Sequence, residues 1–340
     1  MIFALAIVGP TASGKTALSL SLAEALSGEI ISCDSMQIYQ GMDIGTAKAT
    51  PEEQSRVRHH LVDFLSPLES YSAETYRTSV IECARDIRAR GKTPVFVGGT
   101  GLYIDSVTRG ASLSAPESDP NYRDKILAEI KSDEDITALW ERLREVDPES
   151  AEKIHKNNIK RVIRALEIYD KTGKPKSLFD KESKETRGEV FLGMIVLDFL
   201  NRDLLYSRID RRVDIMMEEG LLSEVRSLYD RGLLAGQTAS AAIGYKELVD
   251  YIEGRCSLDL AVENIKLASR RYAKRQLTWF RHEDGARTIT VDKPCGSIKS
   301  CEELLSEALV IADEFKQKYI SECENNEGKR AYQPFALGRA

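Results

Sequence analysis

A glycine-rich segment near the start of the chain carries the residues best suited to binding phosphate. Residues 9–16 match the P-loop pattern G-x-x-x-x-G-K-[ST] in full. The apolar run 2–8 predicts a buried strand before this segment, and the run 17–26 predicts a helix after it. Backbone N–H groups and the helix N-terminus can then cradle phosphate oxygens. We expect the chain to bind a pyrophosphate-bearing molecule through the whole segment: Gly9, Pro10, Thr11, Ala12, Ser13, Gly14, Lys15 and Thr16, with Mg²⁺ on the Thr16 hydroxyl.

An aspartate follows the next apolar strand. Nucleotide hydrolases place a Mg²⁺-binding Asp after a second strand, but here the candidate strand 94–97 is followed by Gly-Gly-Thr with no acid. Instead, Asp34 follows the predicted strand 29–32. Ligands of open α/β sheets bind at the carboxyl ends of the strands, so Asp34 should lie beside the P-loop. The alternative is that Asp34 caps the turn that follows it.

Two arginines on a predicted helix, residues 202–219, offer further positive charge. Arg208 and Arg212 are four residues apart and therefore share a helix face, from which they could clamp phosphate oxygens. Asp210 and Asp214 lie close by in the sequence, so a surface helix stabilised by ion pairs is the competing interpretation. The sequence leaves both open.

The net charge of −6 hides two basic stretches, at residues 153–176 and 266–281. Local basic patches attract polyanions even on an acidic protein, although two solvated helix faces would give the same pattern. The six cysteines form no C-x-x-C pair and the four histidines no metal-binding motif, so we expect reduced thiols, a cytoplasmic protein and no zinc site. No apolar run approaches the roughly 20 residues of a membrane span, and the first residues lack signal-peptide features.

The order of predicted elements indicates an α/β fold. Strands and helices alternate over the first hundred residues, which favours a parallel sheet with crossover helices. The pattern from about residue 112 to 187 is helical, and 190–197 is again a strand. Beyond residue 201 we expect mostly helices (202–219, 221–231, 239–251 and 258–282), a short strand at 288–291 and a helix from Ser300. We therefore predict a P-loop NTPase-like parallel sheet core (1–111 and 188–318) with a helical insertion domain (112–187), a helix-rich C-terminal part and a disordered tail (323–340).

Together, several segments resemble one family, the tRNA dimethylallyltransferases of bacterial type. The matching segments are 9–16, 34–39, 42–48, 59–61, 98–104, 147–148, 154–155, 161–167 and 274–281. The resemblance runs from about residue 2 to 282. It implies transfer of a dimethylallyl group from dimethylallyl diphosphate to the exocyclic N6 amine of the adenosine 3′-adjacent to the anticodon.

This chemistry suits the residues already singled out. A carboxylate can remove the proton of a weakly nucleophilic amine, which is the role we assign to Asp34. Fixed cations and hydrogen-bond donors should stabilise the departing diphosphate, a role for Lys15, Thr11, Arg208 and Arg212 with Mg²⁺ as cofactor.

The resemblance also implies that the anticodon stem-loop of a tRNA is the partner, with the target adenosine extruded from its stack. The residues expected to contact tRNA are Asp34, Ser35, Met36, Gln37, Thr100, Arg123, Lys160, Arg161, Arg164, Tyr245, Lys246, Lys274, Arg275 and Arg281. Gln37 could read a base edge. The segment 241–246 begins with Ala where relatives often carry Arg, which weakens an RNA contact at position 241.

Three alternatives remain at this point. An isopentenyltransferase for free adenine nucleotides would not need the basic insertion, and a P-loop kinase of a small metabolite would turn over ATP. A non-enzymatic RNA-binding protein would not need Lys15 and Asp34 together. We expect a monomer that does not bind membranes.

Overall fold

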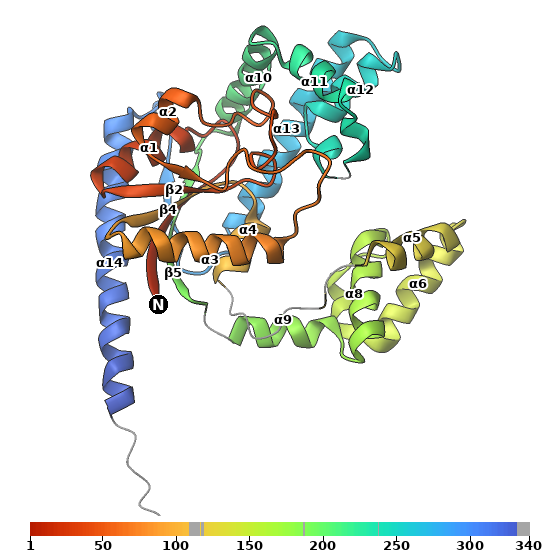
Figure 1. The fold of residues 1–340 in the computed structure, drawn as a ribbon, viewed down its shortest axis with the longest axis horizontal. Coiled ribbons are helices and arrows are strands. Elements are labelled where there is room, and N and C mark those ends of the chain that lie inside the picture. The colour runs from red at the N-terminus through yellow and green to blue at the C-terminus, as the bar shows by residue number, and fades with distance from the viewer. Residues whose placement is uncertain (109–115, 117–118, 186–187, 237, 332–340) are drawn as a thin grey trace, which may run out of the picture. The chain divides into compact units, whose positions relative to one another are not determined.

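The computed structural model describes residues 1–108, 116, 119–185, 188–236 and 238–331. The chain forms two compact units: a core unit of Met1–Val107 with Glu189–Ala340, and an inserted unit of Thr108–Gly188. Figure 1 shows a sheet flanked by helices in the first and a group of helices in the second. The expected helical insertion, 112–187, lies within the inserted unit.

The core unit is built on a six-stranded, wholly parallel sheet with strand order β3-β2-β4-β1-β5-β6. The strands are β1 (Ile2–Val8), β2 (Gly28–Cys33), β3 (His59–His60), β4 (Thr93–Gly98), β5 (Val190–Asp198) and β6 (Arg287–Thr290). The predicted strands match β1, β2, β4, β5 and β6 within a few residues, and β3 was not anticipated. Because all strands run in one direction, the P-loop after β1 and Asp34 after β2 emerge at the same edge.

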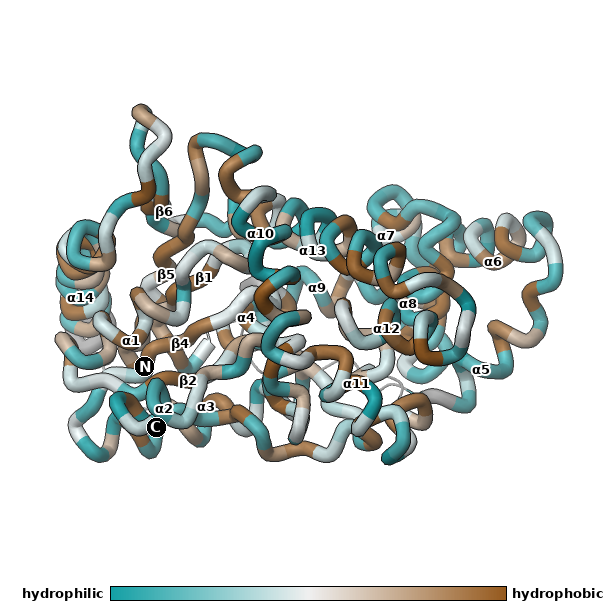
Figure 2. Tube along the Cα trace, turned by 90° about the horizontal axis from the view of Figure 1, so that it is seen from above, coloured by the Kyte–Doolittle hydropathy of each residue, from teal (hydrophilic) through white to brown (hydrophobic). Residues whose placement is uncertain are grey.

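The two faces of the sheet are buried by different helices. Leu5 and Ile7 of β1 pack in a cluster with α1 (Lys15–Ala25) and α14 (Cys301–Ala331), whereas Ala4, Ala6 and Val8 pack with α3 (Ala73–Ala89) and α4 (Gly101–Thr108). Successive residues of a strand point to opposite faces of the sheet. Where helices cover both faces, every residue of the strand is buried, so the strand must be apolar throughout. Figure 2 shows this as hydrophobic colouring along the central strands.

Beside the sheet, a helical region of the core unit has a hydrophobic cluster of its own. It combines α10 (Arg202–Glu218), α11 (Leu221–Asp230), α12 (Tyr245–Ile252) and α13 (Leu258–Phe280) with residues Ile38, Tyr39 and Met42 from the loop after β2. The predicted helix 239–251 is wrong in its first half, which contains a short 3₁₀ turn, Ala239–Ala241. Gly244 adopts φ 95°, which an α-helix excludes, and α12 begins only after it.

Three further features of the core unit concern its helices. The helix α2 (Pro51–Arg56), capped by Thr50, was not anticipated. The helix predicted to start at Ser300 is present, since Ser300 and Glu303 form the expected reciprocal cap of α14. However, α14 continues to Ala331. The tail predicted from residue 323 therefore overlaps the end of this helix, and 332–340 lies outside the described residues.

The inserted unit consists of five helices within its described residues: α5 (Pro120–Glu129), α6 (Asp133–Val146), α7 (Pro148–Lys153), α8 (Ile159–Thr172) and α9 (Lys176–Glu185). A small core joins α6, α7 and α8 around Leu143, Val162 and Leu166. Asp147 is buried and accepts hydrogen bonds from the N–H groups of Ser150 and Ser177, so that it holds the starts of α7 and α9.

Candidate active site

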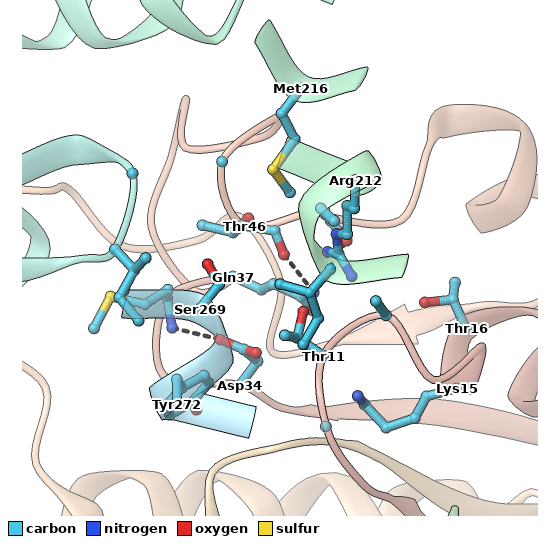
Figure 3. A pocket seen from close by; sticks show the side chains of 18 of the residues that line it. Thr11, Lys15, Thr16, Asp34, Gln37, Thr46, Arg212, Met216, Ser269 and Tyr272 are labelled. Carbon is cyan, nitrogen blue, oxygen red and sulfur yellow. Dashed lines mark hydrogen bonds between the residues drawn. The ribbon is translucent and has the colours of Figure 1, made fainter. Parts of the chain in front are cut away.

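A pocket of about 820 Å³ opens at the carboxyl ends of the strands and lies wholly in the core unit. The P-loop forms one wall, the segment 34–37 after β2 a second, and α10 and α13 much of the remainder. Figure 3 shows Lys15, Asp34 and Arg212 converging on it from three different elements. The structure therefore brings together residues that the sequence separates by almost 200 positions.

The P-loop has the backbone geometry of a phosphate cradle. Gly14 adopts φ 89° at the N-cap of α1, in the left-handed region that favours glycine. Ala12 adopts φ 62°, also left-handed. The Ser13 hydroxyl is buried and makes no hydrogen bond to any residue that the structure describes. A buried polar atom without a partner is costly, so this hydroxyl is suited to a phosphate oxygen.

Lys15 reaches back over the P-loop, and its Nζ donates to the carbonyl oxygen of Pro10 at 2.7 Å. Burial of the ammonium group and repulsion by Arg212 lower the pKa of Lys15 to about 7, and the charge of Asp34 opposes this shift only in part. Burial likewise lowers the pKa of Arg212. Asp34 thus compensates the charges of these two cations only in part. A bound diphosphate would add the negative charge that is missing.

Asp34 follows β2 and lies at the pocket as expected. Its Oδ1 accepts a hydrogen bond from the N–H of Met36 at 2.9 Å, so Asp34 also makes the local turn of the alternative interpretation. A carboxylate has about four acceptor positions on its two oxygens, so this one bond leaves capacity for a substrate proton. Tyr272 of α13 lies beside Asp34 in Figure 3, and burial followed by the charge of Asp34 raises the pKa of Tyr272.

Arg208 and Arg212 face the pocket and not the acids of their own helix. The Nε of Arg208 donates to the Ala12 carbonyl oxygen at 3.0 Å. Asp210 instead pairs with Arg270, and Asp214 pairs with Lys266. The interpretation of α10 as a self-paired surface helix is therefore wrong.

One turn beyond Arg212, the lining of the pocket becomes apolar. Met216 follows Arg212 at the helical spacing of four residues, and both line the pocket (Figure 3). Further apolar lining residues are Met36, Ala47, Val213, Leu221, Ile243 and Ile265. A cationic end next to an apolar end matches a ligand with a charged head and a hydrocarbon tail.

Two residues hold the loop that borders this apolar end. Glu224 of α11 accepts hydrogen bonds from the successive N–H groups of Asp43, Ile44 and Gly45, and also from the Tyr245 hydroxyl. Gln37 donates from Nε2 to the carbonyl oxygens of Thr46 and Ala47 and accepts from the Ser32 hydroxyl. The sequence did not predict the role of Glu224, because its bonds join segments about 180 residues apart.

Several residues expected at tRNA make contacts within the core unit. The Gln37 amide makes the bonds just described and also lines the pocket, whereas Tyr245 is 0 % exposed. The Thr100 hydroxyl accepts from the N–H of Ser35. Lys246 pairs with Glu247 and Arg281 pairs with Asp198, but both cations are exposed. Ser35, Met36 and Arg275 line the pocket, and Lys274 is exposed on α13.

In the inserted unit the expected cations fall into two groups. Arg123 and Arg164 pair with the buried Glu167, and Arg164 also donates to the Pro116 carbonyl oxygen. These two arginines are held by an internal carboxylate of the unit. Lys160 and Arg161 are exposed and form no ion pair within the part of the unit that the structure describes. This second group is the one available to a polyanion.

Sequence reasoning missed Gln276, Tyr272, Ser269 and Arg211, which all line the pocket. The first three lie on α13, one or two turns apart, on the side that faces the pocket. The segment 274–281 was singled out for its resemblance and its positive charges, so a signal was present, but the uncharged Gln276 was overlooked.

Comparison with known proteins identifies the family of this chain. A family model described as IPP transferase matches residues 37–283. The chain belongs to the IPP transferase family. It is 52 % identical to the tRNA dimethylallyltransferase of Geobacillus thermodenitrificans over 82 % of this chain and 87 % of that one. It is thus a prenyl-transferring enzyme of the tRNA dimethylallyltransferase family.

Solved structures give the same result. The full-length tRNA isopentenylpyrophosphate transferase of Bacillus halodurans is 42 % identical, with a TM-score of 0.70 over 95 % of this chain and 99 % of that one. A eukaryotic dimethylallyltransferase described as acting on tRNA is 29 % identical, with a TM-score of 0.73 over 85 % of this chain and 74 % of that one. Separately, no helix among the described residues is long and apolar enough to cross a membrane.

Proposed function

We propose that this pocket binds dimethylallyl diphosphate and transfers its dimethylallyl group to the N6 amine of the adenosine 3′-adjacent to the anticodon of a tRNA. The observation that carries the proposal is the arrangement within one pocket of Lys15 and Arg212, Asp34 beside them, and an apolar end around Met216. The cations are suited to bind the diphosphate, and the apolar residues are suited to contact the five-carbon group. The carboxylate is suited to accept a proton from the amine.

In the reaction, the N6 nitrogen forms a bond to C1 of the dimethylallyl group while the bond between C1 and the diphosphate oxygen breaks. The electron pair of that bond leaves with the diphosphate. Lys15, Arg208 and Arg212 and the P-loop amides stabilise the charge that develops there. Asp34 accepts the proton that N6 loses. Thr11 assists by donating its hydroxyl to a diphosphate oxygen.

The donor set beside Lys15 fits Mg²⁺. Thr16 offers a hydroxyl oxygen at the pocket, which is a hard oxygen donor of the kind that Mg²⁺ prefers. No cluster of three metal-ligating His, Cys, Asp or Glu side chains occurs in the described ranges. Mg²⁺ commonly completes its shell with water and substrate phosphates, so Thr16 would hold it together with the diphosphate. When bound, the ion neutralises charge on the leaving diphosphate.

The tRNA is recognised through its anticodon stem-loop, and Lys160, Arg161, Lys274 and Arg275 are the candidates for its phosphates. The target adenosine is extruded from the stack to reach the pocket. We further propose a monomer, in the cytoplasm, where the free cysteines would stay reduced.

The proposal is tested by offering three substrates in parallel. With dimethylallyl diphosphate, mass spectrometry of nucleosides should find one dimethylallyl unit on the target adenosine of tRNA and none on AMP. ATP with Mg²⁺ should release no phosphate. Transfer to AMP would favour the free-nucleotide enzyme, and phosphate release from ATP would favour a kinase.

A further inference from the structure

One buried amide side chain joins two loops at the pocket. Gln276 of α13 is 5 % exposed. Its Oε1 accepts a hydrogen bond from the N–H of Thr11 in the P-loop at 3.0 Å, and its Nε2 donates to the carbonyl oxygen of Gly99, after β4, at 3.0 Å. The bridge needs an acceptor and a donor on neighbouring atoms of one uncharged side chain, and the terminal amide of Gln provides both.

The two loops have different tasks at the site. The P-loop carries Lys15 and Thr16. The loop after β4 supports the segment that carries Asp34, because Gly98 is paired with Cys33 in the sheet and the Thr100 hydroxyl accepts the N–H of Ser35. Gln276 therefore links the group that holds phosphate to the group that accepts the proton.

The space around Gln276 is shaped for this bridge. A Cβ atom at position 99 would overlap the Nε2 of Gln276, so only glycine permits the approach. One turn earlier on α13, Tyr272 lies beside Asp34 (Figure 3). The same helix thus reaches the P-loop, the β4 loop and the surroundings of the carboxylate.

We propose that Gln276 is a positioning residue, which sets the distance between the diphosphate bound in the P-loop and the carboxylate of Asp34. It makes no contact with the reacting atoms, and it acts through the backbone of Thr11 and Gly99. The reactive geometry of a transferase tolerates little displacement, and an error of about 1 Å can cost on the order of 100-fold in rate. This inference rests on the proposed function of the pocket.

The test is Gln276→Met, which keeps the length and apolar volume of the side chain but removes both hydrogen bonds. We expect kcat for prenyl transfer to fall by about 10- to 100-fold, while the KM for dimethylallyl diphosphate changes less than about threefold. Gln276→Glu retains only the acceptor when ionised and should lose kcat as well. The matched control is Gln40→Glu, because Gln40 is exposed, and it should leave kcat unchanged.

A second measurement does not depend on activity. Hydrogen exchange of the Thr11 amide should be protected in the wild-type enzyme and become faster in Gln276→Met, while the amides of β1 stay protected. Unchanged exchange at Thr11, or a rise in KM with kcat intact in a folded variant, would overturn the positioning role. If the proposed function were wrong, neither the wild-type enzyme nor any variant would catalyse prenyl transfer. The exchange rate of the Thr11 amide would still show whether Gln276 holds the P-loop.

Discussion

Lys15 and Asp34 both line the pocket, and the lowered pKa of Lys15 makes the charge of the pocket sensitive to pH. Burial and Arg212 lower this pKa to about 7, so the empty pocket holds a largely neutral Lys15 at alkaline pH. A bound diphosphate adds negative charge and raises the pKa again. Binding above pH 7 must therefore take up a proton.

We predict that the affinity for dimethylallyl diphosphate falls as pH rises above about 7, by up to about tenfold per pH unit. Below that pH Lys15 is already protonated, so it contributes no pH dependence to the affinity. Lys15→Arg carries a guanidinium that stays charged, so its affinity should not show this fall. Titration calorimetry between about pH 6 and 9 measures both proteins, and the ligand's own ionisation is common to them. Parallel pH profiles for the two would contradict the prediction.

At the scale of elements, the loop 42–49 depends on a carboxylate from another helix. Glu224 accepts the N–H groups of Asp43, Ile44 and Gly45, which lie outside helices and strands. The loop borders the apolar end of the pocket, since Ala47 lines it. The conformation of this loop should therefore affect both the stability of the fold and the binding of dimethylallyl diphosphate.

We predict that Glu224→Ala lowers the free energy of unfolding by about 2 kcal/mol, because the variant cannot make several hydrogen bonds to a charged acceptor. The KM for dimethylallyl diphosphate should rise as well. Urea unfolding and steady-state kinetics measure these effects, and Glu218→Ala on the exposed surface of α10 is the matched control. Equal stability of the two variants would show that Glu224 does not hold the loop.

The elements themselves were predictable from the sequence, whereas the contacts between them were not. Apolar runs and amphipathic periods located β1, β2, β4, β5, α8 and α13, because burial imposes those patterns locally. The boundary of α12 was missed, since Gly244 interrupts a helical pattern that is otherwise continuous. The bond from Thr11 to Gln276 spans 265 positions, and no local pattern encodes such a contact.

At the site, charge and spacing identified Lys15, Asp34, Arg208 and Arg212, which all line one pocket. Charge and spacing did not reveal which polar side chains also serve the fold. Gln37 and Tyr245 were expected to contact RNA, and the structure uses both to hold the loop beside the pocket. A polar residue in a motif can be required by the backbone around it as much as by a substrate.

At the scale of the whole molecule, the inserted unit contains two kinds of cation. Arg164 is tied to the buried Glu167, so its replacement tests the stability of the unit more than RNA binding. Lys160 and Arg161 are exposed and can release counterions from a phosphate backbone.

We predict that Lys160→Ala with Arg161→Ala weakens tRNA binding most at low salt and flattens the slope of log K against log salt by about 0.7–0.9 for each phosphate that is no longer neutralised. The affinity for dimethylallyl diphosphate should not change. Filter binding across a salt series measures the slope, with Lys316→Ala and Lys318→Ala on α14 as a control that removes the same charge. A slope equal to that of the control would remove Lys160 and Arg161 from the interface.

In the proposed reaction, Asp34 accepts a proton during prenyl transfer to one adenosine of a tRNA. The most direct test is single-turnover transfer from dimethylallyl diphosphate, followed by nucleoside mass spectrometry, with Asp34→Asn and with Asp203→Asn, an exposed acid of α10, as its control. We predict that Asp34→Asn lowers the rate on the order of 10²–10⁴-fold with unchanged tRNA affinity, and that the control keeps the wild-type rate. A near-wild-type rate for Asp34→Asn, or a dimethylallyl group found elsewhere than on the adenosine 3′-adjacent to the anticodon, would contradict the account.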